Sequence, residues 1–500
     1  MTIDDILINN KDYYSFETFV LSLLKIHVEK QERPYRIVNR SSVGDAIADK
    51  GFDNFEGKTV IEIKPILHSR TINNIINQFQ HGFLSVDNLF DFRNLIIISS
   101  RRITISTRLF VDEVLKTNEL SGVKIIFWGP EELDKIISKH KKEATEIANN
   151  LFTKRLENAI SVVTKDWKIE RDARIDVLKD IYARGQFSMF LGAGVSSSAG
   201  MADWNTLLNS LFVSYLTKEF SGNEKIVEDD ITEIVSRLNH LDETSALMAA
   251  RYLRKALVKN TKEETDFINA ITENLYGLRD KTKPMESGLL QSITNLCMPM
   301  RTGAKVKSVI TYNFDDLLER ILDSKKIKHH SVYIDNDFCD PEDLPVYHVH
   351  GFLPEDRKKY TALQKSTLVF SEEGYHLIYS DSYHWSNLVQ LSNLRDNNCL
   401  MIGLSMTDPN LRRLLDISAR NLDKPRHFAF IKRIAHSTFC YEKDKQSKTD
   451  KQVIKNLKAA DNFLEVHHKL NEDLMRELGV TVIWYEDYNE IPILLNKLNI

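Results

Sequence analysis

The stretch Phe187–Gly200, which reads FSMFLGAGVSSSAG, decides how most of this chain can fold. Its first five residues are largely apolar, as in the buried strands of parallel sheets. Glycines follow at 192, 194 and 200, and a helix can start in the serine run between them. A glycine turn after a buried strand lets the backbone approach a diphosphate, and a helix N-terminus presents N–H groups to it. A tight turn that holds no ligand is the simpler alternative.

These glycines stand out because glycine is scarce in the rest of the chain. The chain has 18 glycines in 500 residues, about half of the usual share of roughly 7%. Proline is also scarce, at 11. Such a chain is expected to be rich in helix. Its length predicts two or three domains rather than one core.

The composition is that of a globular protein, with 42% hydrophobic and 28% charged residues. Lys and Arg number 67 and Asp and Glu 71, so the net charge of −4 excludes a strong global field for nucleic acid. No secretory signal starts the sequence and no apolar run approaches the ~20 residues of a membrane span, so we expect a cytoplasmic protein. The cysteines form no CxxC pair, which argues against disulfides and structural zinc; they are Cys297, Cys339, Cys399 and Cys440.

Apolar runs and helix-favouring stretches divide the chain into three parts. Residues 1–140 are expected to form a smaller α/β domain, residues 141–183 a helical connector, and residues 184–500 a doubly wound parallel sheet with a helical insertion at 205–300. In the first part, Ser15 is expected to cap a helix. Further helices are expected at Thr71–Phe83 and Leu109–Lys116, and strands at Tyr35–Val38, Val60–Ile63, Leu95–Ile98 and Val123–Trp128. The strands expected in the third part are Phe187–Leu191, Val306–Tyr312, Val346–Val349, Cys399–Leu404, His427–Ile431 and Val480–Tyr485.

Polar side chains follow two of the strands expected in the third part. KSVITYNFDD places Thr311, Asn313 and Asp315 at the carboxyl end of a strand, the edge where open α/β sheets bind ligands. Helix capping by Asn313 or Asp315 is the alternative. PVYHVHGF places His350 and Gly351 at the end of another strand, and histidine is the usual acid–base side chain near neutral pH.

Taken in order, these motifs resemble the sirtuin fold. Sirtuins carry a GAGxS turn, a TxNxD strand end, a catalytic HG and a later GxS strand end that contacts the dinucleotide. In CLMIGLSMTDPNLRRLL, Asp408 and Pro409 are also expected to begin a helix. The residues that match the sirtuin motifs are Gly192, Ala193, Gly194 and Ser196; Thr311, Asn313 and Asp315; His350 and Gly351; and Gly403 and Ser405.

The departures from the sirtuin pattern are informative. The thiolate pairs that hold zinc in deacetylases are missing, and GMADW replaces the usual GIPDFR, with Trp204 in the aromatic position. FSEEGY and IGLSMTDPNLRRLL resemble the divergent sirtuin-like domains of bacterial antiviral defence proteins. That resemblance implies cleavage of NAD+ to nicotinamide and ADP-ribose, and regulation by homo-oligomerisation or by an activating or inhibiting partner.

The resemblance also implies roles for single residues. The turn from Gly192 to Ser196 would cradle the diphosphate. Asn313 would hold the nicotinamide ribose or orient the water, and Asp315 would stabilise the positive ribose or hold the nicotinamide amide. His350 would be the general base or would orient the ribose hydroxyls.

A second constellation lies in the first 140 residues. Glu62 and Lys64 are two apart on the expected strand TVIEI, so they project from the same face, and Asp45 can join them. This set suits Mg²⁺-dependent phosphodiester hydrolysis. It resembles the PD-(D/E)xK restriction-endonuclease fold of the Mrr type, where a glutamine on the next helix often helps (Gln78 or Gln80). An exposed ion pair explains the same residues, and such domains also serve as docking modules for nucleic acid or protein.

Three functions therefore follow from the sequence. The first is an NAD+ hydrolase of antiphage defence whose N-terminal domain senses nucleic acid or docks a partner. The second is a Mg²⁺-dependent nuclease regulated by an NAD-related ligand. A protein deacylase ranks last, because the thiolate pairs are missing. No membrane association is expected.

Overall fold

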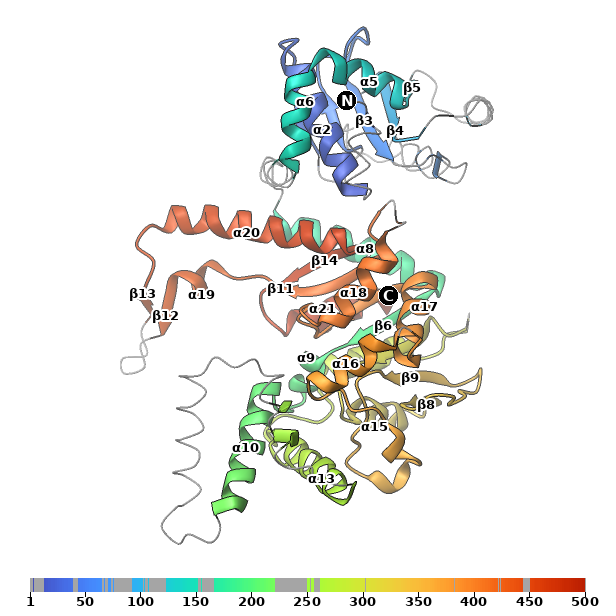
Figure 1. The fold of residues 1–500 in the computed structure, drawn as a ribbon, viewed down its shortest axis with the longest axis vertical. Helices are drawn as coiled ribbons and strands as arrows, with labels where there is room; N and C mark the ends of the chain where they lie inside the picture. Colours follow the sequence, from blue (N-terminus) through green and yellow to red (C-terminus); the bar gives the residue numbers. More distant parts are fainter. Residues whose placement is uncertain are drawn as a thin grey trace. The chain divides into compact units, whose positions relative to one another are not determined.

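In the computed structural model, the chain divides into two units (Figure 1). The first unit comprises Met1–Glu170, Arg420–Lys424 and His436–Glu477, and the second comprises Arg171–Ala419, Pro425–Ala435 and Leu478–Ile500. The structure describes residues 3, 13–38, 44–64, 67, 71–72, 75, 92–101, 103, 107, 123–151, 154, 166–220, 250–251, 253–255, 261–301, 303–381, 383–420, 422, 424–443 and 450–499.

The first unit contains a mixed five-stranded sheet in the order β1-β2-β3-β4-β5. β1 to β3 pair antiparallel, and β3 to β5 pair parallel. Its elements are α2 (Tyr13–Glu29), β1 (Tyr35–Ile37), β2 (Ala46–Ala48), β3 (Thr59–Lys64), β4 (Asn94–Ser99), β5 (Lys124–Trp128), α5 (Pro130–Lys139) and α6 (Lys141–Asn149), followed late in the chain by α19 (His436–Cys440), β12 (Tyr441–Lys443), β13 (Asp450–Gln452) and α20 (Leu457–Glu477).

The core of this sheet forms because apolar side chains recur at helical spacing along α2. Phe16, Phe19, Val20, Leu23 and Leu24 are all buried and pack against β3, β4, α5 and α6. The predicted helix is thus confirmed, but α2 begins at Tyr13, so Ser15 lies inside the helix and is not its cap. The helices expected at 71–83 and 109–116, and Gln78 and Gln80, lie outside the described residues.

The second unit is built on a seven-stranded sheet in the order β14-β11-β10-β6-β7-β9-β8, and every pair of neighbours is parallel. This confirms the predicted parallel sheet. Its elements are α8 (Trp167–Arg184, in this unit from Arg171), β6 (Phe187–Leu191), α9 (Ala193–Ser198), α10 (Trp204–Phe220), α13 (Thr261–Gly277), α14 (Gly288–Cys297), β7 (Val306–Thr311), α15 (Leu317–Ser324), β8 (His329–Val332), β9 (Leu344–His348), α16 (Glu372–Ser380), α17 (Trp385–Asp396), β10 (Asn398–Ile402), α18 (Pro409–Ala419), β11 (His427–Lys432), β14 (Val480–Tyr485) and α21 (Glu490–Asn496), with 3-10 turns at Arg357–Lys359, Leu363–Lys365 and Lys497–Asn499.

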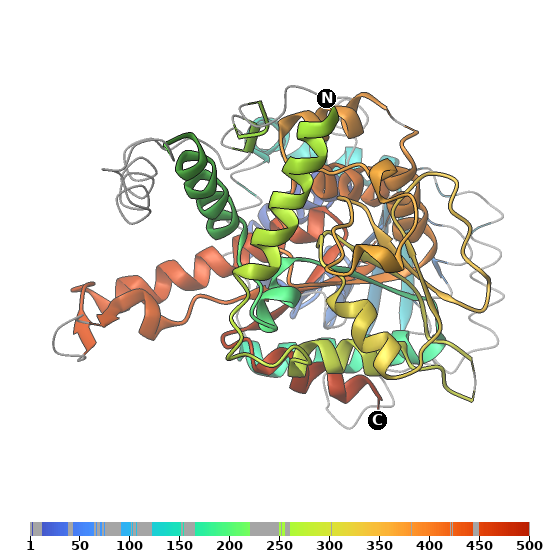
Figure 2. The same ribbon diagram turned by 90° about the horizontal axis from the view of Figure 1, so that it is seen from below.

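Helices cover both faces of this sheet. Figure 2 shows α8, α14 and α21 side by side along one face, where Tyr182 of α8 packs edge-on against Phe187 and donates a hydrogen bond to the carbonyl of Leu296. The next residue of β6, Ser188, points to the other face and bonds to Asn393 of α17 at 2.9 Å. The predicted doubly wound arrangement follows from this alternation of side chains along each strand.

The predicted connector 141–183 contributes helices to both cores. Ala144 and Ile147 of α6 are buried in the core of the first unit. Ile175 and Leu178 of α8 are buried in the core of the second. In the predicted insertion 205–300, the described part is mainly helical, with α10, α13 and α14. None of the described helices is both long enough and apolar enough to cross a membrane.

The turn after β6 packs directly on the end of β10. β6 and β10 are neighbours in the sheet, but the next strand after β6 (β7) and the next strand after β10 (β11) lie on opposite sides of this pair. The direction in which strands are added to the sheet therefore reverses here. The N–H of Gly194 donates to the carbonyl of Gly403 at 2.9 Å, and that of Gly192 to Ile402 at 2.9 Å. A Cβ on Gly194 would lie 2.8 Å from the Cα of Gly403. Glycine is therefore required here for contact between two backbones.

Gly194→Ala is expected to lower the free energy of unfolding by about 1–3 kcal/mol, because the added methyl group displaces the backbone of Gly403. Urea unfolding measures the change. Gly277→Ala is the matched control, since a Cβ there meets nothing within 4 Å, and its stability should be unchanged or slightly higher. Equal stability of the two variants would contradict this account of the turn.

Candidate functional site

The predicted site residues lie at the carboxyl ends of β6, β7, β9 and β10, the edge where doubly wound sheets bind ligands. The N–H groups of Gly192, Gly194 and Val195 already donate to protein carbonyls. Between them, Ala193 is exposed. The turn therefore offers a ligand fewer backbone donors than its glycines suggest.

Asn313 joins the end of β7 to the glycine turn. Its side-chain amide donates to the carbonyl of Gly192 at 3.0 Å and to Ser196 Oγ at 2.8 Å. Both N–H groups of the amide are thus used, and the side-chain oxygen is left as the acceptor available to a ligand. The Asn313 N–H bonds to Thr311 Oγ1 at 3.1 Å, which fixes the first residue of the turn after β7.

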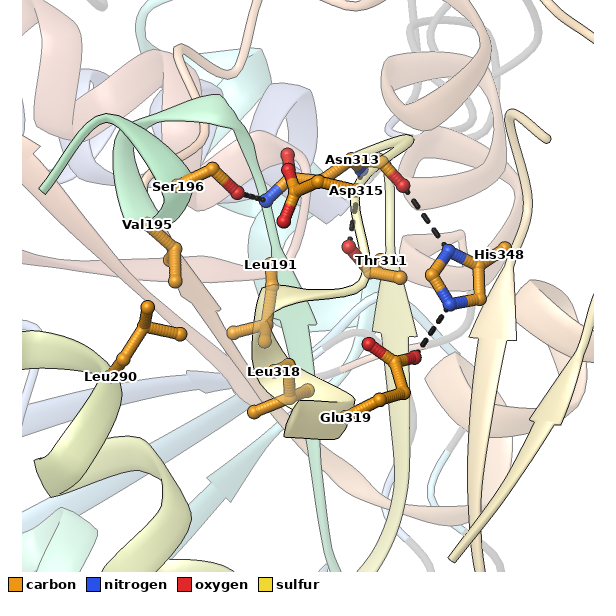
Figure 3. Close-up of a pocket in the computed structure, with 10 residues that line it drawn as sticks. All are labelled: Leu191, Val195, Ser196, Leu290, Thr311, Asn313, Asp315, Leu318, Glu319 and His348. Atoms are coloured by element: carbon orange, nitrogen blue, oxygen red, sulfur yellow. Dashed lines mark hydrogen bonds and ion pairs between the residues drawn. The ribbon is translucent and has the colours of Figure 1, made fainter. Parts of the chain in front are cut away.

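Asn313, Ser196 and Asp315 line one small pocket (Figure 3). Its free volume is about 10 Å³, close to what one water molecule needs. The structure thus brings together four residues that the sequence predicted as site residues, since Thr311 also lines this pocket. The full lining is Leu191, Val195, Ser196, Leu290, Thr311, Asn313, Asp315, Leu318, Glu319 and His348.

Asp315 is a buried carboxyl group. Burial raises its pKa to about 6, although a hydrogen bond with Ser196 and the N–H of Leu317 favour the ionised form. The Leu317 N–H donates to Asp315 Oδ1 at 3.2 Å. Asp316 is the N-cap residue of α15, so the capping role considered for Asp315 is wrong, although Asp315 does accept from the first N–H of the helix and lines the pocket.

His350 follows β9 by two residues, as Asn313 follows the neighbouring β7, and the last residues of the two strands, His348 and Thr311, pair. It is 7% exposed, and its Nε2 has no hydrogen-bond partner among the described residues. Burial lowers the pKa of His350, and the nearby Asp408 carboxylate partly offsets this. The ring is therefore neutral near pH 7 and its buried nitrogen can accept a proton.

Asp408 and Tyr375 complete the surroundings of His350. Asp408 Oδ2 lies 3.8 Å from His350 Nε2 and accepts a hydrogen bond from the Tyr375 hydroxyl at 2.5 Å. Burial and the Asp408 charge raise the pKa of Tyr375, which keeps the hydroxyl a donor. Asp408 Oδ1 accepts from the Leu411 N–H at 2.7 Å, which confirms the predicted helix cap.

The remaining predicted residues make the following contacts within the protein, and their roles toward a ligand stay predictions. Trp204 packs against Phe370 and Phe314, with ring centroids 4.7 and 6.1 Å away. Gly351 adopts a φ of 107°, and Gly403 a φ of 69° with its carbonyl bonded to Gly194. Ser405 is exposed and shares a hydrogen bond with Thr407 at 2.6 Å.

Four residues of this edge were not predicted as site residues: Tyr375, Asp408, Glu319 and His348. The sequence did carry signals for three of them. Asp408 stands in the GLSMTD motif, where capping explained it, and His348 precedes the predicted His350 by two residues. Glu319 falls on the buried face of a helix, where its charge is unusual.

In the first unit, the structure brings Asp45, Glu62 and Lys64 together. All three are at most 3% exposed. The Lys64 ammonium lies 2.6 Å from Glu62 Oε1 and 4.0 Å from Asp45 Oδ2. The described ranges contain no group of three His, Cys, Asp or Glu side chains placed to hold a metal ion. The restriction-endonuclease-like fold and a Mg²⁺ site here stay predictions.

Ionisation of Asp315 is expected to cost stability. Its pKa is about 6 in the folded chain against 3.8 for an ordinary aspartate, so the folded state binds the proton more tightly. Relative to Asp315→Asn, the wild type should lose about 3 kcal/mol as the pH rises from about 4 to about 6, and little above that. Urea unfolding of both proteins over this range measures the difference, and parallel curves would refute the assignment.

Comparison with known proteins finds a SIR2-like match in the part of the chain that contains several of these site residues. Residues 307–457 match the SIR2-like domain family, a span that holds β7, β9 and β10 with Asn313, Asp315, His350 and Asp408. The chain is also 24% identical over 337 residues to the NAD(+) hydrolase ThsA of Enterococcus faecium; the alignment covers 66% of this chain and 58% of that relative. The parallel sheet of the second unit fits a sirtuin-like fold, and about two thirds of the chain is distantly similar to an NAD(+) hydrolase.

Proposed function

We propose that this protein hydrolyses NAD+ to nicotinamide and ADP-ribose. One observation carries the proposal: Asn313 is tied by its side-chain amide into the glycine turn at the switch point of the sheet, with Asp315 beside it in one pocket. The match of residues 307–457 to the SIR2-like domain and the similarity to an NAD(+) hydrolase support it.

The reaction breaks the bond between C1′ of the ribose and the nicotinamide nitrogen. The electron pair of that bond leaves with nicotinamide, and positive charge develops on the ribose. Water adds to C1′ and gives up a proton, so the products are ADP-ribose, nicotinamide and H⁺. The enzyme must orient the ribose and admit one water molecule while it excludes others.

Asn313 supplies the orientation. With both N–H groups bonded to Gly192 and Ser196, its oxygen is fixed in direction and can accept a hydrogen bond from a ribose hydroxyl or from the attacking water. Asp315 is mostly ionised at pH 7, since its pKa is about 6, and its carboxylate is placed to stabilise a positive ribose.

His350 accepts the proton. Its ring is neutral near pH 7 because burial lowers its pKa, and its Nε2 is unpartnered within the described part of the chain. The carboxylate of Asp408, 3.8 Å away, stabilises the imidazolium that forms. The Tyr375 hydroxyl keeps that carboxylate in place.

We extend the proposal to the physiological role implied by the resemblance. The protein acts as an effector of bacterial antiphage defence by depleting NAD+. The first unit senses nucleic acid or docks a partner protein, and assembly into homo-oligomers or partner binding controls the activity. An unregulated enzyme of this kind would poison its own cell, which is the reason to expect such control.

Asn313→Ala and His350→Ala are expected to abolish NAD+ consumption, because the first removes the fixed ribose contact and the second the base. Nicotinamide release from NAD+ is measured with the full chain, with and without phage DNA or extract of infected cells. Ser188→Ala, at the other end of β6, serves as the control with full activity. Full activity in both site variants would refute the assignment, and no turnover under any condition would refute the function.

A Mg²⁺-dependent nuclease is the second candidate, and the convergence of Asp45 and Glu62 on the Lys64 ammonium favours it. Carboxylate oxygens suit Mg²⁺, and these two would hold the ion, with Lys64 positioning the water. The Glu62–Lys64 contact means that the ion would have to displace an existing ion pair.

Under this second candidate, Asp45→Asn abolishes both Mg²⁺ binding, measured by calorimetry, and cleavage of phage DNA, because one of two carboxylate ligands is lost. Asn313→Ala leaves both unchanged. Under the NAD+ hydrolase proposal, Asn313→Ala abolishes nicotinamide release and Asp45→Asn leaves it unchanged. Absence of Mg²⁺ binding and DNA cleavage in the wild type would eliminate the nuclease.

A further inference from the structure

The turn that carries Asn313 and Asp315 contacts one side chain, His348 of β9, at both of its ends through hydrogen bonds. Its Nδ1 lies 3.2 Å from the carbonyl oxygen of Asn313, where the turn begins. Its Nε2 lies 2.7 Å from Oε1 of Glu319, where the turn has passed into α15 (Figure 3). One imidazole ring thus spans the segment from residue 313 to residue 319.

This pair of contacts is deeply buried. His348 and Glu319 are each 1% exposed, and the ring of Phe352 packs on the imidazole with centroids 4.0 Å apart. Ser331 of β8 donates a further hydrogen bond to Glu319 Oε1 at 3.3 Å. Water cannot replace either contact without opening the core, so the two ends of the turn stay fixed relative to β9.

Hydrogen-bonding capacity constrains the contacts of His348. A carbonyl oxygen can only accept a hydrogen bond, and so can an ionised carboxylate. Burial alone would raise the pKa of Glu319, but the charge and hydrogen bond of His348 lower it overall. The Asn313 carbonyl and the Glu319 carboxylate thus contact the two nitrogens of one imidazole, and His348 and Glu319 form a buried pair.

The second carboxylate oxygen connects this pair to the proposed site. Glu319 Oε2 is buried without a hydrogen-bond partner in the described part of the chain, and Glu319 lines the same pocket as Asn313 and Asp315. The Glu319 charge also contributes to the raised pKa of Asp315. The pair therefore lies directly behind the residues that would contact a ligand.

We propose that His348 and Glu319 are positioning residues, which fix the turn 313–319 so that Asn313 and Asp315 are held in reactive geometry. As a statement about catalysis, this inference rests on the proposed function. A buried ion pair adds little stability compared with apolar side chains of the same volume, so fold stability alone is a weak reason for it. Misplacing a catalytic group by ~1 Å, by contrast, can cost ~100-fold in rate.

The test separates a contribution to fold stability from the positioning of Asn313 and Asp315, by replacing His348 and Glu319 with apolar side chains. Glu319→Met combined with His348→Phe is expected to fold with near-wild-type stability, because no buried charge is left unpaired. Its kcat should nevertheless fall about 100-fold with little change in KM, because only the geometry of the turn is lost. Wild-type kcat in this folded variant would overturn the inference.

Glu319→Gln is the conservative partner of this experiment. The introduced glutamine amide can donate a hydrogen bond to Nε2 of a neutral His348, while Nδ1 still donates to the carbonyl of Asn313. Because both hydrogen bonds persist, kcat should stay within about threefold of wild type. Should the apolar variant not fold, His348→Gln is used in its place. The glutamine amide can reach either the Asn313 carbonyl or the Glu319 carboxylate but not both, so one of the two hydrogen bonds is lost. Ser188→Ala controls for the loss of a buried polar contact remote from this edge.

Hydrogen exchange decides the inference independently of the reaction. In the apolar variant, exchange should accelerate in peptides that span residues 311–319 and remain unchanged in β10 and β11. Unchanged exchange across 311–319 would overturn the positioning role even if the wild type is an NAD+ hydrolase. If the wild type consumes no NAD+, the proposed function fails, while faster exchange confined to this turn still supports the positioning role.

Discussion

Backbone contact between the turn after β6 and Gly403 after β10 is the constraint on which the second unit depends. β6 and β10 pair up to Leu191 and Ile402, and the strands that follow them, β7 and β11, lie on opposite sides of this pair. Gly194 and Gly403 meet without any Cβ between them, at a distance that a single methyl group would disrupt. Ser196 is thereby placed one helical turn later, where it receives the Asn313 amide. The contact between the two glycines therefore sets the position of Ser196, and Ser196 in turn sets the orientation of the Asn313 side chain.

The sheet and the pocket residues could be predicted because their signals are local. Buried strands are short apolar runs, and a parallel sheet puts all their polar ends on one edge, so Asn313, Asp315 and His350 followed from position alone. The strands β2 and β8 were not predicted. β2 has three residues, and β8, HHSV, alternates too weakly to be distinguished from a loop.

The partners of His350 and of Asn313 could not be predicted, because they arise from tertiary structure. Asp408 has a sufficient local explanation as a helix cap, and only the fold brings its second oxygen to His350 and Tyr375. Glu319 and His348 are 29 residues apart and meet only through the pairing of β7 with β9. The use of the turn N–H groups by Ile402 and Gly403 is likewise invisible in the sequence, where the glycines pointed to a ligand.

The pairing of β6 with β10 has a consequence for the order of events during synthesis. Leu191 pairs with Ile402, so the two paired strand ends are roughly 210 residues apart in the chain. Contacts of such long range form late, and domains made during translation fold as units from the N-terminus. A ribosome must therefore complete more than four fifths of the chain before β6 can pair with β10. The residues of the first unit up to Glu170 are already outside the ribosome by then, so they can begin to fold before β6 pairs with β10.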